Sequence, residues 1–131
     1  MMYFLETVVS AILFALFDLV WIGFVMKGFY TRMLEPVIGA FKLNIIPAAI
    51  TYIFLGIGVA VFAIPISKSP LTAFLYGALL GFVVYGVYDA TNAATIARWP
   101  LQFALADIAW GTVATGLVTL LIYVIFPHSR N

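Results

Sequence analysis

The sequence predicts an all-α integral membrane protein: a bundle of four antiparallel transmembrane helices, with a short interfacial amphipathic helix between the first span and the second. Three observations carry this prediction. The 131-residue chain is 66% hydrophobic and only 8% charged, whereas soluble domains carry about 25% charged residues. Its apolar residues gather in four stretches of about 20 residues, the length that crosses a bilayer. A soluble fold of this size could not hide so much apolar surface.

The four spans are delimited by helix-breaking residues. "ISKSP" and "ARWP" place Pro70 and Pro100 at the starts of the third and fourth spans, where the missing N–H of proline costs little. Connections this short make successive helices antiparallel neighbours. We therefore predict a single membrane domain over 1–131 with spans at about 3–26, 44–66, 71–94 and 101–126.

Small residues on two of the spans indicate where helices pack closely. Gly77 and Gly81 form a G-x-x-x-G pair, and Gly111 with Thr115 repeats the spacing on the fourth span. In lipid, such residues let helix backbones approach each other. The third and fourth spans are therefore expected to be in close contact.

The segment "KGFYTRMLEPVIGAFKL" joins the first two spans and has an amphipathic pattern. Its apolar residues recur in pairs every four residues, which is close to the helical period. This pattern is typical of a short helix that lies in the membrane interface, here at about 29–41. Such a helix either seals one end of the bundle or forms a lid over a site beneath it.

Several classes of site are excluded by composition. Cysteine is absent, and the single histidine is His128. Disulfides, a cysteine nucleophile and a histidine-based zinc or haem site are therefore not available to one chain. The net charge is +1 and no basic stripe is present, so we expect no nucleic-acid partner. No cofactor is indicated, and we assign no metal site.

Three carboxylates lie inside the spans, where ionisable residues are costly and mark functional sites. Asp18 lies late in the first span, Asp89 late in the third and Asp107 early in the fourth. In an antiparallel bundle these three positions belong to the same half of the bilayer. The carboxylates are therefore expected to lie close together, beneath the amphipathic helix.

Other polar and aromatic residues share the faces of these carboxylates. Asn92 follows Asp89 by three residues and Tyr85 precedes it by four, and such neighbours share a helix face. Trp21 and Trp110 each follow a carboxylate by three residues and either line an apolar slot or stack on a cation; Trp99, just before Pro100, is interpreted as an interfacial anchor. The predicted ligand- or proton-binding residues are Asp18, Asp89, Asn92, Asp107, Trp21, Trp110, Tyr85, Tyr30, Arg32 and Arg98.

Several basic residues lie at the end of the bundle that holds the three carboxylates. Lys27, Arg32, Lys42 and Arg98 balance four acidic residues there, which favours a network of ion pairs with Arg98 as the first partner. The opposite end holds only Lys68 and Arg130. By the positive-inside rule, the carboxylate end would face the cytoplasm.

Motifs along nearly the whole chain resemble those of a known family. "FDLVW" in the first span, "FY" after it, "YDATN" closing the third span, then "WP" and D-x-x-W-G resemble a family of small four-span bacterial inner-membrane proteins catalogued as a domain of unknown function. The resemblance implies these marked positions: Asp18, Trp21, Tyr30, Asp89, Thr91, Asn92, Trp99, Pro100, Asp107, Trp110 and Gly111. It implies no activity. The architecture is also similar to that of small multidrug-resistance transporters, although three carboxylates here replace that family's one glutamate.

Three functions remain open at this point. The site can bind a proton, a cation or a small ligand, as in a homodimeric transporter. It can belong to a membrane enzyme that acts on lipid or another apolar substrate, with Asp89 or Asp107 as general acid or base. Because no nucleophile or phosphate-binding motif is present, a divalent cation held by the carboxylates and Asn92 would supply the catalytic chemistry in that case. It can also be a polar knot that fixes helix register in a structural or accessory subunit. The bilayer, a second copy of the chain and a small cationic or lipid ligand are the expected partners.

Overall fold

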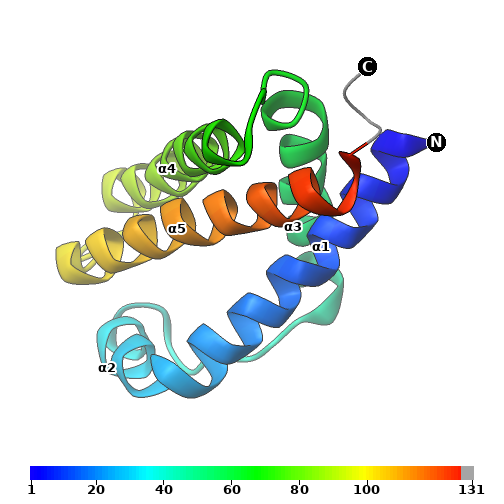
Figure 1. Ribbon diagram of the computed structural model, residues 1–131. Coiled ribbons are helices and arrows are strands. Elements are labelled where there is room, and N and C mark those ends of the chain that lie inside the picture. The colour runs from blue at the N-terminus through cyan, green and yellow to red at the C-terminus, as the bar shows by residue number, and fades with distance from the viewer. Residues whose placement is uncertain (128–131) are drawn as a thin grey trace.

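The computed structural model describes residues 1–127 and is helical throughout its regular parts (Figure 1). His128 and Arg130, used above for the metal and orientation arguments, lie outside the described residues. Within 1–127 no strand occurs, so the predicted all-α fold class is confirmed. In chain order the elements are α1 (Met2–Val20), the π-helical η1 (Trp21–Val25), α2 (Lys27–Ile38), α3 (Ile45–Gly58), the π-helical η2 (Val59–Ala63), α4 (Pro70–Thr95) and α5 (Leu101–Ile125).

Four of these helical units are long and apolar enough to cross a membrane: Met2–Val25, Ile45–Ala63, Pro70–Thr95 and Leu101–Ile125. Large apolar side chains such as Phe24, Leu43 and Phe54 are mostly exposed on the isolated chain. On a soluble protein such a surface would be a liability, but a bilayer solvates it. The exposed apolar surface therefore marks the lipid-facing side of each helix.

Local sequence explains where the helices begin and end. Ser69 caps α4: its hydroxyl accepts from the Thr72 backbone N–H at 3.2 Å, while the Thr72 hydroxyl accepts from the Ser69 N–H at 2.8 Å. This reciprocal capping box satisfies two donors at the helix start. The short helix α2 ends at Gly39, whose φ of 82° suits glycine. It occupies the amphipathic segment predicted at 29–41, slightly earlier in the chain.

The helices alternate in direction, so their ends are sorted into two groups. In Figure 1, the end of α4, the start of α5 and the whole of α2 lie at one end of the molecule, while the N-terminus and the end of α5 lie at the other. The end of α1 leads directly into η1 and α2. We call the end that carries α2 the α2 end; Asp18, Asp89 and Asp107 lie on the parts of their helices nearest to it. A fourth carboxylate within a spanning helix, Glu6, is fully buried near the opposite end of α1.

The tightest contact in the bundle joins α4 to α5. A Cβ on Gly77 would overlap Thr119, and a Cβ on Gly81 would overlap the Gly111 carbonyl and Thr115. The predicted small-residue packing is thus present. α1 packs on α3 and α5, whereas α4 meets the α3 side mainly through η2. The core between these helices contains Phe14, Val59, Val118 and Ile122, all with no exposed surface.

The α4–α5 packing predicts opposite effects for two glycine substitutions. Gly81→Ala should lower the free energy of unfolding by about 1–3 kcal/mol, the cost of overpacking a tight contact. Gly86→Ala should leave stability unchanged or raise it by up to about 1 kcal/mol, because its Cβ meets nothing within 4 Å and alanine favours the helix. Circular dichroism during thermal and denaturant unfolding in a mild detergent measures both. Equal effects of the two substitutions would contradict this packing.

Candidate intramembrane carboxylate site

The three carboxylates lie at a common depth beneath the α2 end. Asp89 lies six residues before the end of α4 at Thr95, and Asp107 lies six residues after the start of α5 at Leu101. Asp18 lies seven residues before the end of η1. At 1.5 Å per residue, each is about 9–11 Å inside the end of its helix. The structure therefore places three acidic groups in one layer of the bundle.

Asp18 connects three helices through hydrogen bonds from neutral donors. Its Oδ1 accepts from Trp110 Nε1 on α5 at 2.8 Å, and its Oδ2 accepts from the Tyr52 hydroxyl on α3 at 3.1 Å. Both carboxylate oxygens are thereby used. Since the lipid interior offers no alternative donors, these bonds hold α1, α3 and α5 together at the depth of the site.

The two tryptophans predicted to line the site stack on each other. The rings of Trp21 and Trp110 are 4.5 Å apart and inclined by 5°. Trp21 lies on η1, and π-helical turns often occur at functional sites. Its Nε1 is buried beside Tyr30 without an acceptor at hydrogen-bonding geometry. The two rings therefore stack on each other, and neither is among the residues that line the cavity described below.

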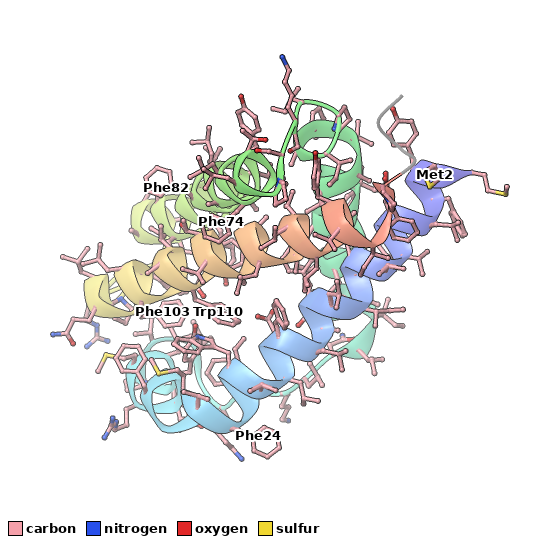
Figure 2. The ribbon with its side chains drawn as sticks, viewed as in Figure 1. Met2, Phe24, Phe74, Phe82, Phe103 and Trp110 are labelled. Atoms are coloured by element: carbon pink, nitrogen blue, oxygen red, sulfur yellow. The ribbon has the colours of Figure 1, made fainter. Side chains whose placement is uncertain are left out.

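Asp107 is covered by α2 through Tyr30. The Tyr30 hydroxyl donates to Asp107 Oδ1 at 3.2 Å, and its ring meets Phe103 edge-on at 4.9 Å. Figure 2 shows Phe103 and Trp110 on the side of α5 that faces α1 and α2. Burial, followed by the charge of Asp107, raises the pKa of Tyr30. Tyr30 therefore keeps its proton at physiological pH and acts as a donor to Asp107.

Asp89 is the most deeply buried of the three, with 1% of its surface exposed. Its Oδ1 accepts from Trp99 Nε1 at 3.2 Å. Within residues 1–127, its Oδ2 is buried and has no hydrogen-bonding neighbour other than the Asp107 carboxyl group. The Asp107 carboxyl group lies next to it and feels its charge. Trp99 reaches back to α4 because Arg98 adopts a positive φ of 63° in the α4–α5 turn. Trp99 was interpreted as an interfacial anchor and is also one of the positions that the family resemblance marks; the structure adds this bond to Asp89.

A cavity of about 300 Å³ opens onto two of these carboxylates. Its exposed lining residues belong to α3 and α4, so its mouth lies between these two helices and faces lipid rather than water. Tyr85 forms part of the wall and packs against Gly111, where a Cβ would overlap the tyrosine ring. The lining consists of Asp18, Thr51, Leu55, Val84, Tyr85, Tyr88 and Asp107.

The prediction of an ion-pair network around the carboxylates is wrong for the described part of the chain. Arg32 and Arg98 are exposed, and neither pairs with a carboxylate. A charged guanidinium gains more from the aqueous interface than from a buried site, so tyrosine and tryptophan supply the donors instead. Asn92 is half-buried and lies beside Tyr88, not in the cavity lining.

The arrangement also limits what the site can hold. Within residues 1–127, no group of three or more histidine, cysteine, aspartate or glutamate side chains is close enough to hold a metal ion. Asp18 and Asp107 share the cavity, while Asp89 lies behind Asp107. What the cavity offers is a pair of carboxylates, with Tyr85 beside them and Tyr88 at the exposed mouth.

Besides the cavity-lining Thr51, Leu55 and Val84, three aromatic residues at the site were not among the predicted binding residues: Tyr52, Tyr88 and Trp99. Tyr52 donates to Asp18, Trp99 donates to Asp89, and Tyr88 lines the cavity. Tyr88 adjoins Asp89 in sequence, but adjacent residues on a helix face different directions, so spacing gave no reason to include it. Tyr52 lies in the same half of the bilayer as the carboxylates, and that was its only sequence signal.

The hydrogen bond from Trp110 to Asp18 predicts a contrast between two matched substitutions. Trp110→Phe keeps an aromatic ring for the stack but removes the donor to a buried carboxylate, and should lower the free energy of unfolding by about 1.5–3 kcal/mol. Trp21→Phe removes a buried N–H that, within residues 1–127, is near the Tyr30 hydroxyl but makes no hydrogen bond of good geometry, and it should cost much less. Denaturant unfolding followed by circular dichroism in detergent tests both. A loss for Trp21→Phe as large as that for Trp110→Phe would show that the ring stack, not the hydrogen bond, carries the stability.

Comparisons with known proteins agree with the motifs noted in the sequence. A family described as "Predicted membrane protein (DUF2177)" matches residues 3–124, which is nearly the whole chain. No curated protein and no solved structure gives a match. The match covers all four spanning helices, α2 and every carboxylate of the site. The chain therefore belongs to the DUF2177 family of predicted membrane proteins.

Proposed function

We propose that this protein is a membrane-embedded binding protein whose carboxylate site accepts the cationic group of a small ligand. One observation carries the proposal. Asp18 and Asp107 line a cavity of about 300 Å³, and in the described residues their hydrogen-bond donors are all neutral: Tyr30, Tyr52 and Trp110. Within residues 1–127, these carboxylates have no cationic partner.

The electrostatics of the site support a cationic ligand. Opposite charges attract far more strongly in a medium of low dielectric constant than in water. Asp89, next to Asp107, adds a third acidic group. A bound cation or a proton would relieve the repulsion between these neighbours. The tyrosine hydroxyls of the wall can also accept hydrogen bonds from a ligand's hydroxyl or ammonium group.

The position of the cavity mouth supports entry from the bilayer rather than passage across it. Thr51, Val84 and Tyr88 line the cavity and are exposed on the lipid-facing surface. On the other side of the site, the core residues Phe14 and Ile122 are fully buried. A homodimeric transporter remains a candidate in this proposal, but transport would require the packed core around Phe14 and Ile122 to open.

A second candidate is a membrane enzyme that acts on lipid, and one observation favours it. Asp89 and Asp107 are neighbouring carboxyl groups within hydrogen-bonding reach of each other. Within residues 1–127, Asp89 Oδ2 is buried and receives no hydrogen bond from any other side chain. A pair of this kind can give and take a proton in general acid–base catalysis. The lateral cavity mouth would suit a lipid substrate equally well.

We further propose a bacterial inner membrane as the location, with the α2 end in the cytoplasm. Helical bundles are one of the two structures that can span a bilayer. The positive-inside rule favours the cytoplasm for the end that carries Lys27, Arg32, Lys42 and Arg98.

The binding proposal predicts that the protein distinguishes choline from 3,3-dimethylbutanol, its uncharged carbon analogue. Choline should change the intrinsic tryptophan fluorescence of the purified protein in neutral detergent, because Trp99 and Trp110 donate to the site carboxylates. The uncharged analogue should have no comparable effect. Asp18→Asn and Asp107→Asn should each weaken choline binding at least tenfold, about 1.4 kcal/mol.

Glu35→Gln is the matched control for these variants. Glu35 is an exposed carboxylate on α2 at the same end of the molecule, so its removal should leave choline binding unchanged. Equal responses to choline and its neutral analogue would contradict the proposal. Loss of thermal stability in the asparagine variants, with no choline response in the wild type, would instead favour a structural polar knot. Turnover of an added lipid that depends on Asp89 or Asp107 would favour the enzyme.

A further inference from the structure

A second hollow continues the carboxylate cavity along the surface between α3 and α4. It has a volume of about 250 Å³. Thr51, Leu55 and Val84 line both spaces, so the two form one groove. The remaining lining residues of the second hollow are Phe54, Gly58 and Leu80. The groove is therefore polar at the carboxylates and apolar along the rest of its length.

Helix packing explains why this groove exists. The glycines of α4 draw it against α5, and α4 meets the α3 side mainly through η2, beyond Gly58. At Gly58 the wall lacks a side chain; a Cβ there would approach Leu80 Cδ2 to 3.3 Å. Gly58 thus keeps the apolar end of the groove open.

The length of the groove matches one half of the membrane. On α4 its lining runs from Tyr88, at the depth of the carboxylates, to Leu80, which is near the middle of that helix. Eight residues of helix span about 12 Å, compared with about 15 Å for half of the hydrocarbon core. A ligand in the groove would reach from the carboxylate layer to the bilayer centre.

We propose that the occupant is a single-chain cationic amphiphile from the surrounding bilayer, with its headgroup at Asp18 and Asp107 and its alkyl chain along Leu55, Gly58 and Leu80. This inference rests on the proposed function, because the headgroup end is the same carboxylate cavity. It adds the class of ligand and its orientation.

Another hollow shows why the polar end matters. A larger space of about 600 Å³ lies between α1 and α3 on the outer surface, near Phe4 and Ile57. No carboxylate lines it, so nothing there would select a ligand over ordinary lipid chains. Of these two hollows, the α3–α4 groove is the one that combines an apolar channel with carboxylates that distinguish one headgroup from another.

The alkyl chain gains little hydrophobic free energy on moving from lipid into the groove, because lipid chains are equally apolar. Its contribution comes from fit between the chain and the groove walls. Blocking the groove should therefore weaken binding of a long-chain ligand and leave a bare headgroup unaffected.

The test compares choline with dodecyltrimethylammonium on three proteins: the wild type, Gly58→Leu and Gly86→Leu. Each is placed in nanodiscs of digalactosyldiacylglycerol, an uncharged lipid without an ammonium group, and titrated by tryptophan fluorescence. Gly58→Leu fills the groove. Gly86→Leu is the matched control, because a Cβ at Gly86 meets nothing within 4 Å and the residue does not line the groove. The long-chain probe partitions into the lipid to the same extent in all three samples, so this partitioning does not affect the comparison of its apparent affinities for the three proteins.

Choline should bind all three proteins equally, whereas dodecyltrimethylammonium should bind Gly58→Leu at least tenfold more weakly than the other two. If choline binds but the long-chain probe binds all three alike, the groove proposal is overturned and the proposed function stands. If neither probe binds the wild type, both are overturned. Leu80→Phe fills the groove from the α4 side and should reproduce the result if Gly58→Leu does not fold.

Discussion

The hydrogen bonds that the carboxylates receive from other helices are the constraint on which the site depends. Inside a bilayer a carboxylate cannot rely on water, so its partners must come from the protein. Asp18 draws Trp110 of α5 and Tyr52 of α3 toward α1. Asp107 accepts a hydrogen bond from Tyr30, which holds α2 over the bundle. Asp89 accepts one from Trp99, which holds the α4–α5 turn against α4. The same bonds that assemble the α2 end therefore define the cavity beneath it.

The chemical type of these donors decides what the site can do. A guanidinium or ammonium group would neutralise the carboxylates and leave a closed ion-pair network. Tyrosine and tryptophan satisfy the oxygens but add no positive charge. Asp18 and Asp107 consequently remain both ordered and available where they line the cavity. This combination is the reason to interpret the cluster as a binding site as well as a structural connection.

The packing of α4 determines where a ligand can enter. Gly77 and Gly81 bring α4 against α5 so closely that side chains on both helices interlock, and α4 consequently touches the α3 side mainly at η2. The open surface between α3 and α4 is therefore a consequence of small residues elsewhere on α4. It lies on the lipid-facing surface, and the tightly packed core beyond the site contains Val59 and Val118.

The sequence by itself determined the all-helical fold, the four apolar helices and the family, because hydrophobic length and short turns leave few arrangements in a bilayer. It also placed Asp18, Asp89 and Asp107 at one depth, since alternating helix direction fixes which ends meet. Only the tertiary structure decided the partners: Tyr52 and Trp99 as donors, the Trp21–Trp110 stack, and the exclusion of Arg32 and Arg98 from the carboxylates. Those choices depend on how each helix is rotated about its axis and on the path of the α4–α5 turn. Both result from side-chain packing between distant segments, which a pattern along one chain does not encode.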